Sequence, residues 1–538
     1  MTFRSPYPEV TIPELALTPY VLRRAGELAD KPALVDGSSG RTLTYGQLAA
    51  AIPRAAAGLA ERGFRHGDVL AIYSPNLPEY ALAFHAAASL GGIVTTVNPL
   101  YTADELAAQL QDAGATYLVT IPQFMDKALD AAQRSNIREV FVLGEAAGAT
   151  PFASLLAGGG QPPEVQINPR EDLVALPYSS GTTGLPKGVM LTHRNLVANI
   201  VQFDYLERVD EGDTLIAILP FFHIYGLVVI LNMGLFAGAT IVTMPRFELE
   251  PFLQLVQDHR VTRGYLVPPI VLALAKHPVV DNYDLSALRM IVSGAAPLGA
   301  NVAEACAERL GCRVKQGYGL TETSPVTHSA PADRIKPGSI GACIPNTECG
   351  VVDLETGADL GPNENGELRI RGPQVMRGYL NRPEATAETI DADGWLRTGD
   401  VGYADEDGYF YIVDRVKELI KYKGLQVAPA ELEAILLAHP AVADAAVIPS
   451  PDEEAGEVPK AFVVLKGEAS GDEIRAFVAE RVAPHKRIRL LEVVDQIPKS
   501  ASGKILRRVL VERERERARA ETQRAVGLAG ADVPKPSE

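Results

Sequence analysis

Short apolar runs alternate with longer amphipathic stretches from residue 68 of the chain onward. Val69–Tyr73 and Ile93–Val97 are apolar runs of strand length, and Glu79–Leu90 and Ala103–Asp112 carry apolar residues at helical spacing. A parallel sheet covered by helices produces this alternation, because each strand is buried on two sides and each helix on one. The pattern therefore predicts an α/β unit. The N-terminal extension before it is expected to contain one helix, Pro19–Leu28.

The same alternation resumes at residue 215 and predicts a second parallel α/β half. The expected elements are strands at Leu215–Leu219, Thr240–Thr243, Gly264–Val267 and Met290–Ser293, with helices from Tyr225 and over Leu249–His259. The stretch Tyr225–Val242 is almost wholly apolar, but Asn232 and three glycines interrupt it. It is also shorter than the ~20 residues of a membrane-spanning helix. We therefore expect a buried helix followed by a buried strand, and no transmembrane segment.

The pattern of apolar and polar positions changes between about residues 338 and 411, where short segments of alternating apolar and polar residues are separated by turn residues. Gly366–Arg371 is one such strand-like segment, and the region as a whole predicts a small β-subdomain. Beyond Arg415–Lys417 the pattern predicts a compact α+β domain. Its expected elements are a helix at Pro429–His439, strands at Ala445–Ile448 and Ala461–Leu465, a helix at Asp472–Val482 and a strand at Leu490–Val494.

The expected fold class is therefore α/β, with two domains. The larger N-terminal domain, residues 1–416, would hold two parallel α/β sheets and the β-subdomain. A smaller α+β domain, residues 417–515, would follow it. A charged tail over residues 516–538 is expected to be disordered.

Composition narrows the class of partner and the compartment. The formal net charge of −16 argues against nucleic acid or an anionic membrane surface, so a bound polyanion must meet a local basic site. The four cysteines form no Cys-x-x-Cys pair, and we expect buried free thiols in a reducing cytoplasm rather than a metal site. Met1–Val10 lacks the apolar core of a signal peptide. A cytoplasmic monomer or homodimer is expected.

Hydroxyl and glycine residues gather in the segment Tyr178–Gly188, directly after the apolar run Leu173–Pro177. The segment holds four Ser or Thr residues, three glycines and Lys187. Glycines allow a backbone to approach an anion closely, hydroxyls and amides donate hydrogen bonds, and lysine adds positive charge. The spacing excludes a Walker A loop, because Leu-Pro separates Gly184 from Lys187 and a glycine follows the lysine. From these residues alone, a different kind of phosphate loop and a polar surface loop both stay open.

Segments further along the chain decide between these two interpretations. With the Tyr178–Gly188 segment, their order and spacing resemble the adenylate-forming enzymes: acyl-CoA synthetases, luciferases and the adenylation domains of peptide synthetases. The resemblance runs from about Leu43 to Leu510 and is closest to 4-coumarate:CoA ligases. The matching segments are Leu176–His193, Phe222–Gly226, Gln316–Glu322, Gly394–Asp400, Val413–Leu432 and Pro498–Arg507.

The resemblance implies an ATP-dependent reaction in which a carboxylate attacks the α-phosphorus and forms an acyl-adenylate and pyrophosphate. Catalysis of such a step consists mainly of positioning and cationic stabilisation. Mg²⁺, which prefers oxygen ligands, would be held by Thr183 and Glu322. Asp400 would accept both ribose hydroxyls. The implied ATP and AMP contacts are Ser179, Ser180, Gly181, Thr182, Thr183, Gly184, Lys187, Ala295, Gln316, Gly317, Tyr318, Thr321, Asp400 and Arg415.

Further residues are assigned to the acyl group and to coenzyme A by the same resemblance. Lys504 would bridge the carboxylate and the α-phosphate, and Lys417 would be the hinge about which the C-terminal domain turns between half-reactions. Lys421 and His223 would be the other catalytic residues, with His223 as wall and gate of the acyl pocket. The implied acyl contacts are His223, Tyr225, Val229, Gly294, Gly319, Lys417, Lys421 and Gln426, and the implied CoA contacts are Arg246, Lys423 and Gly424. The spacing of Lys421 and Lys423 alone fits a second interpretation equally well, in which both are simply exposed residues of a turn.

The residues around His223 limit the class of acid that the chain would use. Residues 221–243 contain no acidic side chain, which disfavours an amino acid substrate, because its ammonium group would lack a partner. Val229 stands where plant 4-coumarate:CoA ligases often place a small hydroxyl residue, and leaving a buried phenol unpartnered costs ~1–3 kcal/mol. We therefore expect an aryl propenoic acid ligase that takes cinnamate at least as well as 4-coumarate. A medium- or long-chain fatty acyl-CoA synthetase and a catalytically silent adenylate-binding protein are the alternatives.

Overall fold

The structure is a computed structural model that describes residues 1–158, 160–179, 186–423, 425–452, 454–500, 503–514 and 516–517. The chain forms two compact units. The first comprises residues 1–398 and 402–411, and the second comprises residues 399–401 and the chain from Ile412 onward.

The first sheet of the large unit has the strand order β10-β11-β9-β5-β4-β6-β7-β8, with β22 paired to β11. Its strands are β4 (Val69–Tyr73), β5 (Ile93–Thr96), β6 (Ala115–Thr120), β7 (Glu139–Val142), β8 (Thr150–Pro151), β9 (Leu173–Ala175), β10 (Tyr178–Ser179), β11 (Lys187–Thr192) and β22 (Gly378–Tyr379). The central strands β9, β5, β4, β6, β7 and β8 are parallel.

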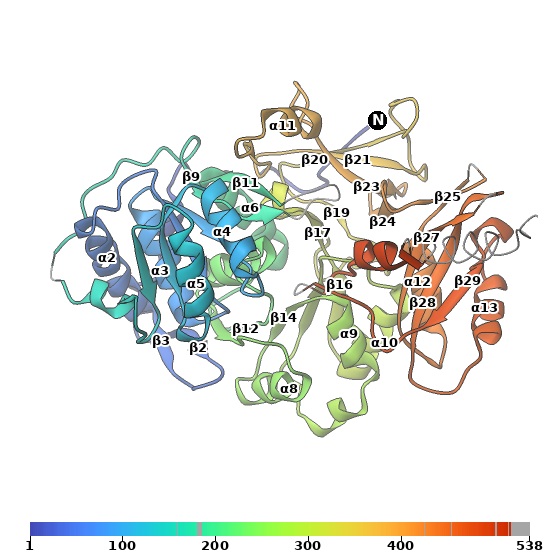
Figure 1. Ribbon diagram of the computed structural model, residues 1–538, viewed down its shortest axis with the longest axis horizontal. Helices are drawn as coiled ribbons and strands as arrows, with labels where there is room; N and C mark the ends of the chain where they lie inside the picture. The colour runs from blue at the N-terminus through green and yellow to red at the C-terminus, as the bar shows by residue number, and fades with distance from the viewer. Residues whose placement is uncertain are drawn as a thin grey trace, which may run out of the picture. The chain divides into compact units, whose positions relative to one another are not determined.

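Strand β4 shows why helices cover both faces of this sheet. Leu70 and Ile72 pack into the core formed with α2 (Tyr45–Glu61) and α3 (Pro78–Ser89). Ala71 and Tyr73 point the other way and pack against apolar residues of two further helices. Figure 1 shows the ribbons of these two helices beside the sheet. These are α4 (Ala103–Asp112) and α5 (Met125–Gln133). A strand with period-2 geometry that is apolar at every position requires this arrangement.

The second sheet has the order β16-β15-β14-β12-β13-β2-β3 and is parallel except at the β2–β3 edge. Its strands are β2 (Pro32–Asp36), β3 (Thr42–Thr44), β12 (Thr214–Ala217), β13 (Thr240–Thr243), β14 (Arg263–Leu266), β15 (Met290–Ser293) and β16 (Arg313–Gln316). Its helices include α6 (His193–Glu207), α7 (Met233–Ala237), α8 (Leu249–Asp258), α9 (Pro268–Lys276) and α10 (Ala300–Leu310). The predicted α/β class with parallel sheets is confirmed.

Two predicted helices differ from the structure. The helix expected over Pro19–Leu28 is wrong in its extent, since α1 spans Leu17–Val21 and hydrogen-bonded turns follow it. Gly26, which is exposed there, has a low helix propensity and brings no apolar contact that would compensate. The helix expected from Tyr225 is present, but Tyr225–Asn232 is a π-helix that runs into α7.

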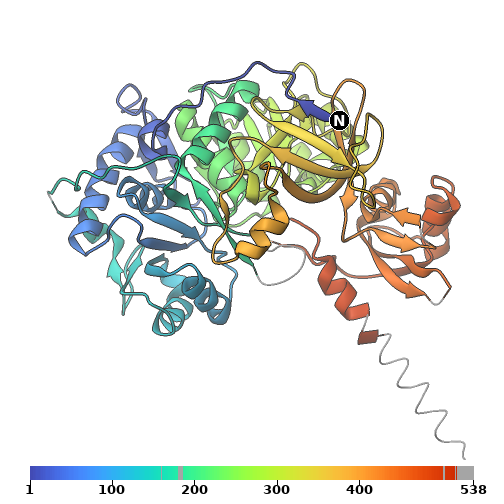
Figure 2. The ribbon, with the colours of Figure 1, turned by 90° about the horizontal axis from the view of Figure 1, so that it is seen from above.

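The predicted β-rich region forms two small sheets. One has the order β1-β20-β21-β23-β24 and the other β17-β18-β19. The strands are β1 (Thr2–Arg4), β17 (Tyr318–Gly319), β18 (Val326–Ser329), β19 (Ala342–Cys343), β20 (Glu348–Val352), β21 (Gly366–Arg371), β23 (Leu396–Ala404) and β24 (Phe410–Arg415), and α11 (Pro383–Thr389) lies among them in the sequence. Figure 2 shows β1, in dark blue, beside the yellow strands, where Phe3 pairs with Cys349.

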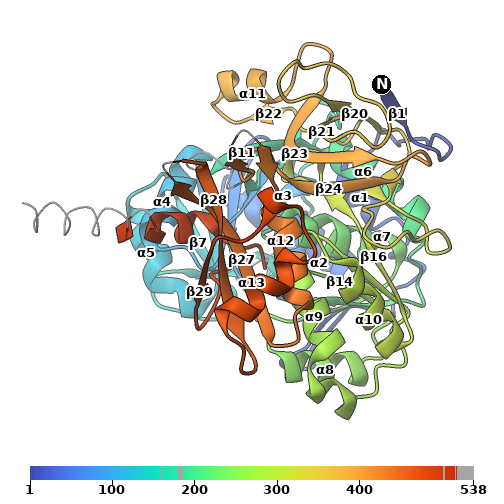
Figure 3. The ribbon, with the colours of Figure 1, turned by 90° about the vertical axis from the view of Figure 1, so that its right-hand side faces the viewer.

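The second unit is built on a five-stranded sheet, and α12 and α13 are two of the helices in its described residues. The sheet has the order β26-β25-β28-β27, with β29 paired to β28. Leu432 and Leu436 of α12 and Ile474 and Val478 of α13 share one buried core with the sheet. Figure 3 shows the ribbons of α12 and α13 beside β27, β28 and β29. The elements are β25 (Ile420–Tyr422), β26 (Leu425–Val427), α12 (Pro429–Ala438), β27 (Val442–Asp452), β28 (Gly456–Leu465), α13 (Gly471–Ala479) and β29 (Leu490–Val493).

Within the described ranges, every helix is too short or too polar to cross a bilayer. The four cysteines, Cys306, Cys312, Cys343 and Cys349, are buried free thiols.

Candidate functional site

Residues that the sequence analysis assigned to different ligands lie at the carboxyl edge of the second sheet. Because β12, β13, β15 and β16 are parallel, the chain leaves all four at the same edge. Ligands of open α/β sheets bind at this edge. The candidates that follow or end these strands are His223 after β12, Arg246 after β13, Gly294 and Ala295 after β15, and Gln316 and Gly317 at β16.

Backbone geometry at this edge depends on small residues. A Cβ added to Gly294 would lie 2.8 Å from the Tyr225 ring, and one added to Gly319 would lie 1.9 Å from the Pro325 carbonyl oxygen. Ala295 adopts φ 69°, in the left-handed region that alanine rarely occupies, so the surrounding structure holds it there. Gln316 fixes the next turn, since its Oε1 accepts a hydrogen bond from the Leu298 amide at 2.8 Å. The chain is thus folded tightly where a ligand would meet it.

Aromatic and apolar residues beyond β12 form the expected acyl region. The Tyr225 amide donates to His223 Nδ1 at 3.2 Å, and the Tyr225 hydroxyl donates to the Val292 carbonyl at 3.1 Å. The Tyr225 and Tyr265 rings meet edge to face, with 6.4 Å between their centroids. Burial raises the pKa of Tyr225, which therefore stays a hydroxyl donor. Val229 is 1% exposed, so this part of the π-helix presents only apolar atoms.

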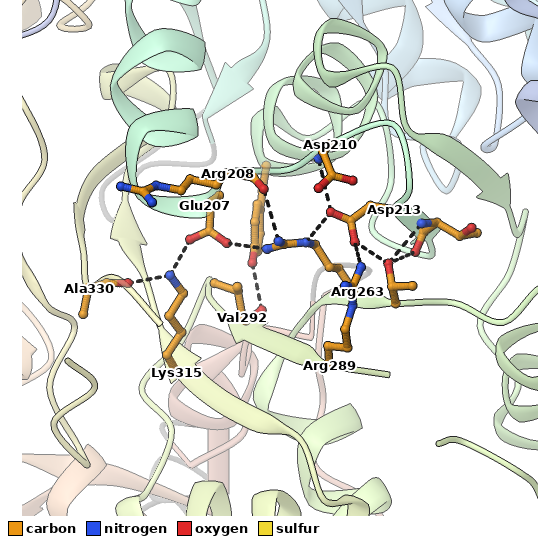
Figure 4. A network of polar contacts seen from close by, with 12 residues as sticks. Glu207, Arg208, Asp210, Asp213, Arg263, Arg289, Val292, Lys315 and Ala330 are labelled. Carbon is orange, nitrogen blue, oxygen red and sulfur yellow. Dashed lines mark hydrogen bonds and ion pairs between the residues drawn. The ribbon is translucent and has the colours of Figure 1, made fainter. Parts of the chain in front are cut away.

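A buried network of charges lies near enough to Tyr225 that, in addition to the effect of burial, the Glu207 carboxylate raises the pKa of that tyrosine. The sequence analysis did not predict this network. Figure 4 shows Lys315, Arg263 and Arg289 facing the carboxylates of Glu207 and Asp213. The side chains of both carboxylates are fully buried. The Lys315 ammonium donates to Glu207 and to the Ala330 carbonyl.

Asp213 holds the other half of the network. Arg263 Nε lies 2.8 Å from Asp213 Oδ2, and Arg289 Nη2 lies 2.7 Å from Oδ1. Burial by itself would raise the pKa of Asp213, but the Thr262 hydroxyl and Arg263 lower it below its ordinary value. Arg263 also reaches to 3.7 Å from Glu207, and so joins the two halves. β16 reads Arg-Val-Lys-Gln, so no local pattern sets Lys315 apart in the sequence.

The phosphate segment is described only at its two ends. Ser179 and Lys187 are opposite each other in the antiparallel pair β10–β11. The Lys187 ammonium lies 4.9 Å from the centroid of the Tyr379 ring. The predicted phosphate contacts Ser180, Gly181, Thr182, Thr183 and Gly184 lie outside the described residues.

Glu322 and its surroundings form the second polar cluster of the large unit. Thr321 and Glu322 lie in the short 3₁₀ helix Thr321–Thr323, directly after β17, whose Tyr318 stands 5.8 Å from the His328 ring. Glu322 is 9% exposed, and its Oε1 accepts a hydrogen bond from the Tyr379 hydroxyl at 2.8 Å. Sequence reasoning missed Tyr379, although it stands in the Gly-Tyr-Leu run that the structure pairs with β11.

The second unit brings Asp400, Arg415 and Lys504 under one another's electrostatic influence. Arg415 Nε lies 3.0 Å from Asp400 Oδ1. Burial lowers the pKa of Lys504, and Arg415 lowers it further, whereas Glu418 and Asp400 favour the charged form. The Lys504 amide donates to the Ser500 hydroxyl at 3.1 Å, which ties the lysine into a hydrogen-bonded turn.

Arg507 is the further residue of this cluster that the sequence analysis did not single out. It lies 2.5 Å from Glu418 and 2.6 Å from Glu433. Burial raises the pKa of Glu433, and Arg507 acts against that rise. The arginine therefore joins the chain after Lys504 to α12 and to the turn after β24.

The β25–β26 hairpin carries the residues expected to serve the thioester step. Lys421 and Gln426 face each other across the hairpin, and both are exposed. Lys423 pairs with Glu454, and Gly424 lies outside the described residues. Lys417 is exposed in the turn between β24 and β25. Arg246, the expected CoA-phosphate contact of the large unit, has a side chain that is 86% exposed.

Comparison with known proteins defines the class to which this fold and these residues belong. The model of the AMP-binding enzyme family matches residues 21–380, and that of the AMP-binding enzyme C-terminal domain matches residues 431–504. The chain belongs to the AMP-binding enzyme family, and the resemblance to adenylate-forming enzymes is confirmed.

Within the family, the chain is similar to 4-coumarate–CoA ligases. It is 48% identical over 523 residues to 4-coumarate–CoA ligase 5 of Oryza sativa subsp. japonica, with 94% of this chain and 96% of that protein covered. It is 46% identical over 554 residues to 4-coumarate–CoA ligase 1 of Petroselinum crispum, with 99% and 98% covered. The anthranilate CoA ligase AuaEII, solved in complex with anthranoyl-AMP, superposes with a TM-score of 0.88 at 28% identity, covering 95% of this chain and 99% of that one.

Proposed function

We propose that this chain is an AMP-forming carboxylate–CoA ligase that activates an aryl propenoic acid of the 4-coumarate or cinnamate type. The observation that carries the proposal is the identity of 46–48% to 4-coumarate–CoA ligases over nearly the whole of both chains. ATP and coenzyme A are its co-substrates, and the acid is consumed in two steps. In the first the carboxylate displaces pyrophosphate from ATP, and in the second the CoA thiol displaces AMP from the acyl-adenylate.

The residues of the large unit supply the nucleotide and acyl contacts of the proposal. Gly294 has no side chain, which lets the Tyr225 ring lie against the backbone at the carboxyl edge of the second sheet, where the aryl group of the acid is proposed to bind. Lys187, with its ammonium beside the Tyr379 ring, meets the negative charge of the phosphates. Lys504 serves the adenylation step as a cation, and Lys421 serves the thioester step.

Mg²⁺ is the ion that the family implies, and the donor groups suit it. Glu322 supplies a buried carboxylate and Thr183 a hydroxyl, both of them oxygen donors. Within the described ranges, no three His, Cys, Asp or Glu side chains cluster as a metal site. An ion held by one carboxylate, substrate phosphates and water fits this arrangement, because Mg²⁺ binds in that way. When bound, the ion neutralises charge on the phosphate oxygens.

The ring of the acid is expected to bear no obligatory hydroxyl. Val229 offers a 4-hydroxyl group no polar partner, and the Tyr225 hydroxyl already donates its hydrogen to Val292. A phenol that lost its water partners without gaining others would bind less well by ~1–3 kcal/mol. Cinnamate should therefore be used at least as well as 4-coumarate.

The experiment is AMP release with ATP, Mg²⁺ and CoA against cinnamate, 4-coumarate, benzoate and fatty acids of medium and long chain. Lys504→Ala is expected to lose adenylation, whereas Lys466→Ala, which removes an exposed lysine of the same unit, should not. Preference for phenylpropenoates supports the proposal. Preference for alkyl chains would move the protein to fatty acid activation, and absence of turnover with every acid would favour a silent adenylate-binding protein.

A further inference from the structure

The Tyr379 side chain stands between the two charged groups that the proposed function places at the nucleotide phosphates. Its hydroxyl donates to Glu322 Oε1 at 2.8 Å, and its ring centroid lies 4.9 Å from the Lys187 ammonium. One aromatic side chain thus contacts both the carboxylate assigned to Mg²⁺ and the lysine assigned to ATP. Neither contact is local in the sequence, since Tyr379 and Glu322 are 57 residues apart.

The backbone holds the Tyr379 side chain in this position from three sides. β22 pairs with β11, so that Tyr379 is opposite Val189, two residues after Lys187. The Tyr379 amide donates to the Thr386 hydroxyl at 2.9 Å. The Met376 amide donates to the Glu322 carbonyl at 2.8 Å, which joins the same chain segment to the backbone of the carboxylate.

Burial makes this hydrogen bond a directional constraint on the carboxylate. Glu322 and Tyr379 are 9% and 8% exposed, so little water reaches them to replace a lost partner. A hydrogen bond to a charged group is about twice as strong as one between neutral groups and fixes the acceptor oxygen in direction. A carboxylate held at one oxygen is restricted in its rotation, which is what pre-organises an ion ligand.

We propose that Tyr379 is a positioning residue that orients Glu322 toward the Mg²⁺ of bound ATP and keeps Lys187 beside it, an inference that rests on the proposed function. Tyr379 does not touch the reacting atoms. It acts through Glu322, so its loss should weaken the contribution of Mg²⁺ to ATP binding and leave ATP binding without the ion nearly unchanged.

The test is calorimetric titration of ATP into the full chain, in Mg²⁺ and in EDTA, for the wild type and Tyr379→Phe. The phenylalanine keeps the ring beside Lys187 and removes only the hydroxyl. Tyr117→Phe is the matched control, because the Tyr117 side chain is also buried and its hydroxyl donates a hydrogen bond of the same length, 2.8 Å, but to the Arg62 carbonyl at the end of α2. We expect Tyr379→Phe to lose about 10- to 100-fold of the affinity gained from Mg²⁺. In EDTA its affinity should stay within about threefold of the wild type.

Two further measurements separate an effect through Glu322 from a general perturbation of the fold. In a Glu322→Gln background, adding Tyr379→Phe should change the Mg²⁺ effect less than twofold, because the two residues act as one unit. CoA transfer from a preformed acyl-adenylate, which needs no Mg²⁺–ATP, should persist in Tyr379→Phe. Equal weakening of ATP binding with and without Mg²⁺, or no weakening at all, would overturn the inference alone. Failure of the wild type to bind ATP would overturn the proposed function as well.

Discussion

Replacing Lys315 by methionine tests whether the ion pairs of the buried charge network, among them Lys315–Glu207, depend on one another for stability. Methionine keeps the length and apolar stem of lysine but removes the ammonium that donates to Glu207 and to the Ala330 carbonyl. Arg263, the other cation near Glu207, is 3.7 Å away and is already engaged by Asp213 at 2.8 Å. The variant therefore leaves a fully buried carboxylate without its principal partner.

The size of the effect follows from burial. Breaking a buried ion pair by removing one partner costs about 3–5 kcal/mol. The large unit holds about 400 residues, and about 2.1 cal/mol/K of unfolding entropy per residue gives about 0.8 kcal/mol/K. Lys315→Met should therefore lower the Tm of this unit by about 4–6 °C.

Calorimetry on the full chain measures this shift, and a double variant tests its cause. Glu207→Gln combined with Lys315→Met removes both charges, so the Tm should recover at least half of the loss, since no buried charge is left unpaired. If the double variant were as unstable as Lys315→Met, the cost would arise from lost packing and the reasoning from charge would be refuted.

Two further predictions concern other buried charges. Burial raises the pKa of Asp204 from 3.8 to about 6, and Arg23 acts against this rise. Ionisation of Asp204 therefore lowers the free energy of unfolding above pH 6. This penalty disappears as the pH falls toward 4. Asp204→Asn should therefore be more stable than the wild type at pH 8 by up to about 3 kcal/mol, with no advantage near pH 4; an advantage independent of pH would contradict this. Arg507→Met should leave the buried Glu433 carboxylate without its arginine and so destabilise the second unit by about 3 kcal/mol. Limited proteolysis beyond residue 412 should become faster. Arg508→Met, which replaces a side chain that is 81% exposed, should change neither the stability nor the rate of proteolysis. Equal protease resistance of both arginine variants would refute the role given to Arg507.

Elements buried on both faces could be predicted from the sequence almost to the residue. Val69–Tyr73 and Met290–Ser293 are strands with those limits, because continuous apolar runs of that length have few other ways to be buried. β27 extends past the predicted Ala445–Ile448 to Asp452, since Pro449 pairs with Pro459 and its missing amide does not end the strand. β1 escaped prediction because its partner β20 lies more than 340 residues away and supplies the pairing that its short polar sequence does not indicate.

In the candidate site, too, some residues could be predicted from the sequence and others could not. Residues within recognisable segments, such as Lys187 and Glu322, could be singled out from the sequence, and their assigned roles are still predictions. Tyr379 and Lys315 could not, because their importance lies in contacts 57 and 108 residues away along the chain. No local pattern carries the information that a tyrosine donates to a particular glutamate.

The π-helix Tyr225–Asn232 gives the chain a tolerance for changes in length at its acyl region. A π-helix closes its hydrogen bonds over one more residue than an α-helix does, and here the Asn232 amide side chain donates to the Leu227 carbonyl at 2.8 Å, within the same segment. Loss of one residue between Tyr225 and Asn232 could therefore be absorbed by a change to α-helical geometry, leaving β12 before it and α7 after it in place. In the acyl site proposed above, such a deletion would turn a different side chain toward the acid without a change in the scaffold. The range of acids would then depend on the number of residues in this segment as well as on their identity.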